Sequence, residues 1–155
     1  MKRFIGLVIS ILIATNANAA PTFTETELKA KTSAFLKAKE AKQQPKTQEA
    51  DIDHFLSFFA DEFKDEHVKF NVTETSKIQF KENLLNKMKD EIAYNKIDIH
   101  SMLVGANVVA VQFTESGKVK PSHLNKFIEY EVSHIMVLEF DDKGFIKHLR
   151  RHHGR

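Results

Sequence analysis

Apolar residues in the first half of the chain recur with the period of a helix. Between residues 47 and 64 the apolar positions are Ile52, Phe55, Leu56, Phe58, Phe59 and Phe63. Their spacing of three and four residues is that of an amphipathic helix, and the positions between them are acidic or polar. We therefore expect a helix over residues 47–64 whose aromatic face packs against a sheet.

Two weaker helical patterns flank this segment. The first covers residues 21–44, begins at a capping box formed by Thr24 and Glu27, and ends before Pro45. It carries few apolar residues, so we expect it to lie loosely on the main body. The second covers residues 76–92, where a Ser N-cap precedes a stripe of apolar positions.

In the C-terminal half the apolar and polar residues alternate, which is the period of a β-strand. Strands are predicted over residues 96–104, 108–114, 127–140 and 145–152. A polar loop over residues 115–126 separates the middle two. Helices followed by an antiparallel meander indicate an α+β fold, with the N-terminal helices packed on one face of a curved antiparallel sheet.

The N-terminus has the pattern of a secretory signal. A basic start is followed by an apolar run over residues 4–14 and by the small-x-small triplet Ala17-Asn18-Ala19. The run is shorter than the roughly 20 residues that a membrane-spanning helix needs. We expect cleavage after Ala19 and a periplasmic or secreted protein; a retained membrane anchor is the alternative.

Removal of the signal changes the charge balance. The chain has 23 Lys and Arg against 21 Asp and Glu, and the excess resides in Lys2 and Arg3. A neutral mature chain does not indicate nucleic-acid binding. The absence of Cys excludes disulfides and thiol chemistry. The 13 Phe residues indicate a thick apolar core or an apolar cavity.

Three stretches of the sequence resemble the nuclear transport factor 2-like superfamily, and within it the SnoaL-like and ketosteroid-isomerase-like proteins. They are the helix at residues 55–62, which resembles the first long helix of the family, the hairpin at residues 97–114, and the strand, turn and strand at residues 136–146. The resemblance implies a cystatin-like or nuclear transport factor 2-like cone, in which a bent sheet wraps around helices and leaves a pocket at its open end.

The resemblance also implies a division of the chain. Residues 1–19 are the expected signal peptide, residues 20–46 an N-terminal helical extension, and residues 47–153 the SnoaL-like domain. Members of the superfamily include isomerases, dehydratases, cyclases, hydrolases and binding modules, so the fold does not determine the function. We expect a small-molecule-binding or protein-interaction module; the alternative is a proton-transfer enzyme.

The candidate catalytic residues are His134 and Asp61. His134 shares the apolar face of the strand at residues 127–140 with Tyr130, and an imidazole there could act as acid or base. The alternative is a core histidine bonded to a backbone carbonyl. Asp61 is expected at the end of the aromatic helix, near the mouth of the cone, where a solvated side chain is the alternative.

The candidate ligand-binding residues are Tyr130, Arg150, His148, Tyr94 and His67. Arg150 and His148 alternate along the last strand, where they could bind an anionic group. Tyr94 could lie at the pocket rim or cap the core, and His67 follows the aromatic helix. The expected partner is a small apolar or anionic molecule, with no nucleic acid, no membrane after signal cleavage, and a possible homodimer through the outer sheet face. No cofactor and no metal site are expected.

Overall fold

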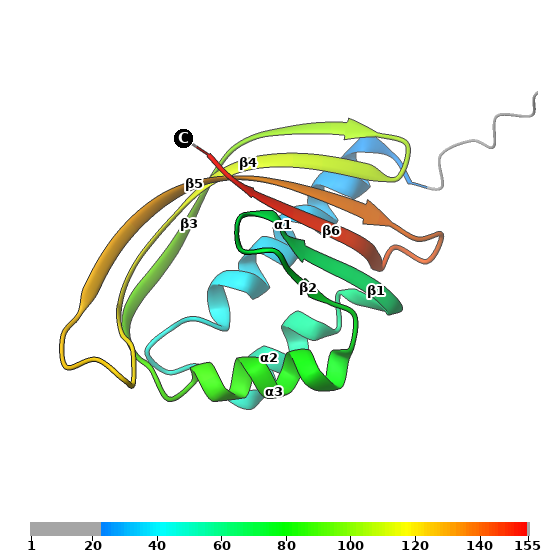
Figure 1. Ribbon diagram of the computed structural model, residues 1–155. Helices are drawn as coiled ribbons and strands as arrows, with labels where there is room; N and C mark the ends of the chain where they lie inside the picture. The colour runs from blue at the N-terminus through cyan, green and yellow to red at the C-terminus, as the bar shows by residue number, and fades with distance from the viewer. Residues whose placement is uncertain (1–22, 155) are drawn as a thin grey trace, which may run out of the picture.

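The computed structural model describes residues 23–154, which form three helices and a six-stranded sheet (Figure 1). The α+β class predicted from the sequence is confirmed. The predicted signal, residues 1–19, lies outside the described residues. The helices are α1 (Glu25–Ala41), α2 (Glu49–Leu56) and α3 (Lys77–Lys87). Among residues 23–154, no helix has the length and apolar content needed to cross a bilayer.

The sheet is mixed rather than wholly antiparallel. Its strands are β1 (Phe59–His67), β2 (Val72–Glu74), β3 (Glu91–Gly105), β4 (Val108–Lys120), β5 (Ile128–Phe140) and β6 (Ile146–His153), with a short 3-10 turn, η1 (Val68–Phe70), after β1. Their order in space is β2-β1-β6-β5-β4-β3. The strands from β3 to β6 form the expected antiparallel meander, whereas β1 pairs parallel to β6. The long strands bend over the helices, which gives the cone (Figure 1).

The aromatic helix ends earlier than its pattern predicts. α2 stops at Leu56, and Phe59 and Phe63 belong to β1, so the predicted helix to residue 64 is wrong. The register of β1 against β6 shifts between Phe59 and Lys64. Residues four apart lie on the same face of a strand as well as of a helix. The spacing of Phe59 and Phe63 therefore fits both elements, and the sequence pattern alone does not distinguish them.

α1 is enclosed by the sheet and is not a loose extension. The capping box at its start is present as predicted. Its buried residues are Leu28, Thr32, Phe35, Leu36, Ala38 and Lys39. Figure 1 shows α1 running beneath the bent strands. The expectation of a loose helix failed because a polar and a charged residue, Thr32 and Lys39, complete the buried stripe.

Phenylalanine side chains from four elements form the centre of the core. Phe59 on β1 has ring centroids of Phe35, Phe55, Phe63 and Phe80 within 4.9–5.9 Å of its own. Edge-to-face and tilted pairs of this kind add to the stabilisation that burial provides. The cluster joins α1, α2, α3 and β1, and two of its members, Phe55 and Phe80, also line the cavity described below.

β4 is longer than predicted and includes much of the expected polar loop. It extends to Lys120, and β3 begins at Glu91 rather than at residue 96. The added residues of β4 pair with both β3 and β5. Backbone hydrogen bonds to these strands hold the segment in the sheet even though its side chains are polar. Glu115 is therefore a strand residue, and it is 7% exposed.

Candidate functional site

A cavity of about 820 Å³ lies between the helices and the concave face of the sheet. Its apolar wall includes Ile52, Phe55, Phe80, Leu84, Ile92, Phe113 and Val119. Its polar lining includes Lys39, Lys42, Asn95, Glu115, Tyr130, His134 and Arg151. A cavity of about 300–1,000 Å³ that combines an apolar wall with convergent polar groups is typical of small-molecule sites.

Glu115 and Lys39 form a buried ion pair in the cavity wall. Lys39 Nζ, on α1, contacts Glu115 Oε2, on β4, and the two side chains are 8% and 9% exposed. Asn95 Nδ2 donates to the other carboxylate oxygen at 3.1 Å. Burial alone would raise the pKa of Glu115, but the Lys39 ammonium and the Asn95 amide hold it at about 2. Glu115 is thus ionised at neutral pH, and both of its oxygens have protein partners.

His134 lies on the inner face of β5, as the alternation predicts. Its Nε2 is 3.7 Å from Glu115 Oε2, and its ring stacks on Phe113 with the centroids 5.1 Å apart. Burial lowers the pKa of His134 to about 4, so the ring is neutral at pH 7. Its Nδ1 is buried without a hydrogen-bond partner among the described residues. The catalytic role of His134 stays a prediction.

Tyr130 joins the same network through Asn95. Asn95 Nδ2 donates to the Tyr130 hydroxyl at 2.9 Å as well as to Glu115. The Tyr130 ring lies against Gly117, where a Cβ would come within 2.6 Å of the hydroxyl oxygen. A glycine at this position therefore gives Tyr130 the space to reach Asn95. The polar lining from Lys39 to Tyr130 is one connected network.

A second ion pair lies beside this network. Arg151 Nη2, on β6, is 2.9 Å from Asp65 Oδ2, on β1, and the Asp65 side chain is 2% exposed. Burial raises the pKa of Asp65, and Arg151 opposes that shift. The His67 ring stacks on the His153 ring, with centroids 5.0 Å apart, and burial lowers the pKa of His67 to about 4. His67 lines the cavity, as expected for a ligand-binding candidate.

Asp61 does not reach the cavity. It lies in β1 rather than at a helix end, its side chain is fully exposed, and its carboxylate is 3.2 Å from Lys77 Nζ. Asp61 therefore lies apart from His134, the other candidate catalytic residue. The carboxylate beside His134 is that of Glu115.

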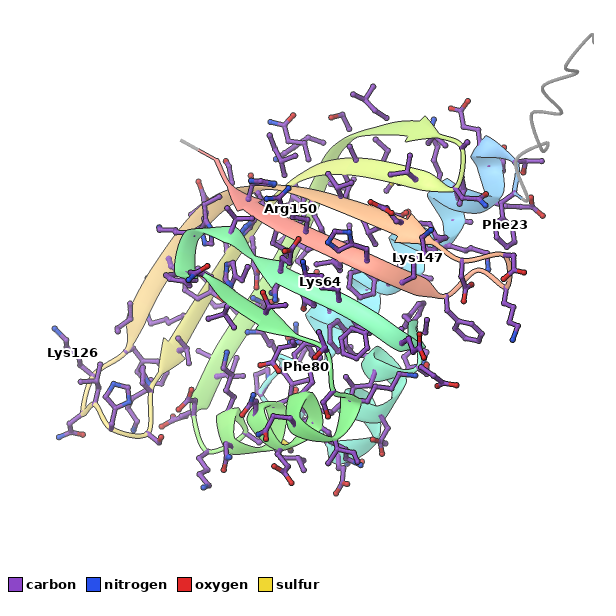
Figure 2. The ribbon with its side chains drawn as sticks, turned by 45° about the vertical axis from the view of Figure 1, so that its right-hand side comes forward. Phe23, Lys64, Phe80, Lys126, Lys147 and Arg150 are labelled. Atoms are coloured by element: carbon purple, nitrogen blue, oxygen red, sulfur yellow. The ribbon has the colours of Figure 1, made fainter. Side chains whose placement is uncertain are left out.

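Arg150 and His148 also lie outside the cavity. Arg150 Nε is 3.6 Å from Glu66, and His148 bonds Glu66 at 2.8 Å. The register of β6 against β5 shifts between Glu139 and Phe140, so the inward positions continue as Leu149, Arg151 and His153. Figure 2 shows Arg150 on β6 and Lys64 on the neighbouring β1, away from Phe80 in the interior. The irregularity brings Arg151 inward in place of Arg150.

Tyr94 lies at the edge of the cavity, near the start of β3. It is 38% exposed, and its hydroxyl donates to Glu129 Oε1 at 2.8 Å. The hydrogen bond raises the pKa of Tyr94. The structure thus brings Tyr94, Tyr130, His134 and His67 to one cavity. Within residues 23–154, no group of three or more His, Asp or Glu side chains could hold a metal ion.

Sequence interpretation missed the charged residues that build the site. Lys39 stands four positions after Phe35 on the stripe that begins at Leu28, so a helical projection could have found it. Glu115 continues the alternation through Phe113, and only its assignment to a loop hid it. In both cases the signal is a charged residue at a position where the periodic pattern predicts an apolar one.

The comparisons with known proteins support the fold. No protein-family model and no curated protein sequence matches the chain. A protein described as a SnoaL-like polyketide cyclase from Shewanella denitrificans matches with a TM-score of 0.68 at 10% identity, over 83% of this chain and 90% of that chain. An LEH-like epoxide hydrolase from M. tuberculosis has a TM-score of 0.61 at 18% identity, over 83% and 84%. An NTF2-like protein of unknown function from Exiguobacterium has a TM-score of 0.63 at 12% identity, over 80% and 98%.

A bent sheet wrapped around helices, with an internal cavity, defines a cone-shaped α+β protein. This cone has the nuclear transport factor 2-like fold. The resemblance predicted from the sequence is therefore confirmed for the fold. Proteins of this fold differ in function, so the function must be inferred from this chain's own cavity.

Stability is expected to fall as the pH drops from about 6.5 to 4. His67 and His134 have folded-state pKa values of about 4, below the roughly 6.5 of an unfolded histidine. The unfolded state therefore binds protons first, and the free energy of unfolding decreases across this window. Urea unfolding midpoints at pH 7, 5.5 and 4.5 would measure the effect.

The double variant His67→Gln and His134→Gln should flatten that pH dependence, whereas His123→Gln, in an exposed loop, should not. Glu115 affects stability in a different pH range. Its folded-state pKa is about 2, so the stabilisation that its ionised form provides is lost only below about pH 4.5. An unchanged slope in the double variant would contradict the prediction.

Proposed function

We propose that this protein is an exported binding module that holds a small, largely apolar molecule in the cavity of the cone. The observation that carries the proposal is a cavity of about 820 Å³ with a wall of aliphatic and aromatic side chains, in which Lys39 pairs with Glu115 and Arg151 pairs with Asp65. Such a lining can desolvate an apolar ligand and orient it through a few polar contacts. Export is supported by the sequence pattern of residues 1–19.

The internal pairing of the charged groups favours binding over proton transfer. Glu115 accepts from Lys39 and Asn95, and its low pKa makes it a poor proton acceptor. His134 Nδ1 is buried and has no hydrogen-bond partner among the described residues. A general base must lie within hydrogen-bond reach of the proton that it removes. Glu115, with both of its oxygens bonded by protein groups, fits a structural role better than that of a general base.

A proton-transfer enzyme is the second candidate function. It is favoured by the contact of neutral His134 with Glu115 at the cavity wall, with Tyr130 close by. Neighbours in fold described as a polyketide cyclase and an epoxide hydrolase support the same alternative. Turnover of a substrate that His134→Ala abolishes would overturn the binding proposal. The homodimer through the outer sheet face stays a prediction, which light scattering tests.

The binding proposal is tested with a neutral, apolar fluorescent probe, N-phenyl-1-naphthylamine. We expect its fluorescence to rise on binding to the processed chain. Val119→Phe fills the cavity from β4 and should weaken binding at least about tenfold, which corresponds to 1.4 kcal/mol. Gln112→Phe, exposed on the opposite face of the same strand, is the matched control.

The control should leave the affinity unchanged. The proposal fails if the probe does not bind, or if the Val119 and Gln112 variants bind it equally well. Circular dichroism of both variants would show that each retains its sheet.

A further inference from the structure

Lys42 is a cavity-lining amine at the C-terminal end of α1. It is the residue that caps the helix, and it stands one turn after Lys39. Its Nζ lies 4.8 Å from the centre of the Phe55 ring, in the aromatic part of the cavity wall. The side chain is half-buried. The amine is therefore held against an apolar surface and faces the space that a ligand would occupy.

Lys42 lacks the counter-ion that the other buried cations of the site have. Lys39 pairs with Glu115, and Arg151 pairs with Asp65. Among residues 23–154, no carboxylate lies within ion-pair distance of Lys42 Nζ, and its close contact is the face of Phe55. An aromatic face attracts a cation more weakly than a carboxylate does at the same place.

The surroundings of Lys42 favour its neutral form. Burial lowers its pKa to about 7, and the positive charge of Lys39 acts in the same direction. Glu115, on β4, opposes the shift, whereas Arg151, on β6, and Lys87, on α3, add to it. Asp65, on β1, faces Lys42 as well, but Arg151 pairs with its carboxylate. A neutral lysine beside another cation is an activated nucleophile.

We propose that the Lys42 amine binds apolar aldehydes and ketones covalently as an imine inside the cavity. The nitrogen lone pair attacks the carbonyl carbon, the carbonyl π electrons move to the oxygen, and one proton passes from the nitrogen to that oxygen. The resulting carbinolamine loses the hydroxyl group together with the second nitrogen proton as water, and the nitrogen and carbon become doubly bonded. No oxidant or reductant is consumed. The proposal rests on the proposed function, because the cavity must first admit the apolar body of the ligand.

The probe is 2-naphthaldehyde, an apolar aldehyde whose aromatic body matches the wall at Phe55. Incubation of the processed chain with the aldehyde and sodium cyanoborohydride at pH 7 reduces any imine to a stable secondary amine. Peptide mass spectrometry then gives the labelled fraction of each lysine. We expect Lys42 to be labelled at least about tenfold faster than Lys87, which lines the same cavity but is exposed.

Two variants and a pH series make the test specific. Lys42→Arg should abolish the label at this position, whereas Lys87→Arg, the matched control, should leave the labelling of Lys42 unchanged. The labelling rate at Lys42 should rise with a midpoint near pH 7, against about 10.4 for an unperturbed lysine. Equal labelling of Lys42 and Lys87, or a midpoint above pH 9, would overturn the inference.

The failure of this inference is distinguishable from the failure of the proposed function. If N-phenyl-1-naphthylamine binds and Val119→Phe weakens it, but Lys42 is not selectively labelled, the imine proposal is wrong and the binding module stands. If the neutral probe does not bind while Lys42 is labelled selectively, the amine is reactive and the cavity is not an apolar binding site. Lys42→Met provides a second unreactive variant if the arginine disturbs the fold.

Discussion

Replacement of Lys39 by methionine is expected to lower the free energy of unfolding by about 3–5 kcal/mol, because it leaves the Glu115 carboxylate buried without its cation. Asn95 still donates one hydrogen bond, which does not compensate for the lost charge. Urea unfolding of the processed chain at pH 7 measures the change. Lys37→Met, at an exposed position of the same helix, is the matched control and should change stability by less than about 0.5 kcal/mol.

A second substitution tests whether the loss comes from the unpaired charge. Adding Glu115→Leu to Lys39→Met removes the charge as well, and most of the lost stability should return. Without Lys39 the pKa of Glu115 rises, so its carboxyl group becomes neutral at a higher pH. The difference in the free energy of unfolding between Lys39→Met and the wild type should therefore become smaller as the pH is lowered. A loss below about 1 kcal/mol in the single variant would contradict the ion-pair interpretation.

Replacement of Phe59 by alanine is expected to cost about 3–5 kcal/mol. Phe59 is 1% exposed and touches rings from α1, α2, α3 and β1, so truncation opens a space that several elements border. Thermal and urea unfolding would measure the loss. Phe145→Ala removes the same group from a side chain that is 42% exposed, and it should cost under about 1 kcal/mol. Equal losses in the two variants would show that the aromatic cluster is not the centre of the core.

Local signals predicted the elements that depend on neighbouring residues. The capping box at Thr24 is present as expected, because a side chain and a backbone amide three residues apart need no other part of the protein. The inward face of β5 follows from plain alternation, and it placed His134 and Tyr130 correctly. Where a strand is regular, the side-chain pattern alone determines which residues meet the helices.

The errors occur where the local pattern is ambiguous or where a distant strand changes it. Phe59 and Phe63 stand four residues apart, a spacing that a helix and a strand share, so the segment after Leu56 resembled a helix. The irregular pairing of β6 with β5 exchanged Arg150 for Arg151, and no signal within a few residues marks it, because it is defined by a partner strand. The sequence interpretation placed His134 at the cavity, but it missed the neighbouring Glu115, which it had assigned to a loop, and named Asp61, which lies outside the cavity.

The parallel pairing of β1 with β6 has a consequence for how the chain folds. β6, the last of the strands along the sequence, lies between β1 and β5, and it joins Glu66 to Arg150 across most of the chain. Without β6, β1 and β2 would form a two-stranded ribbon separate from the meander, and such a ribbon is marginally stable by itself. The sheet is therefore completed only by a contact of high sequence separation. We expect this contact to slow folding and to make β1 and β2 unfold together with the meander.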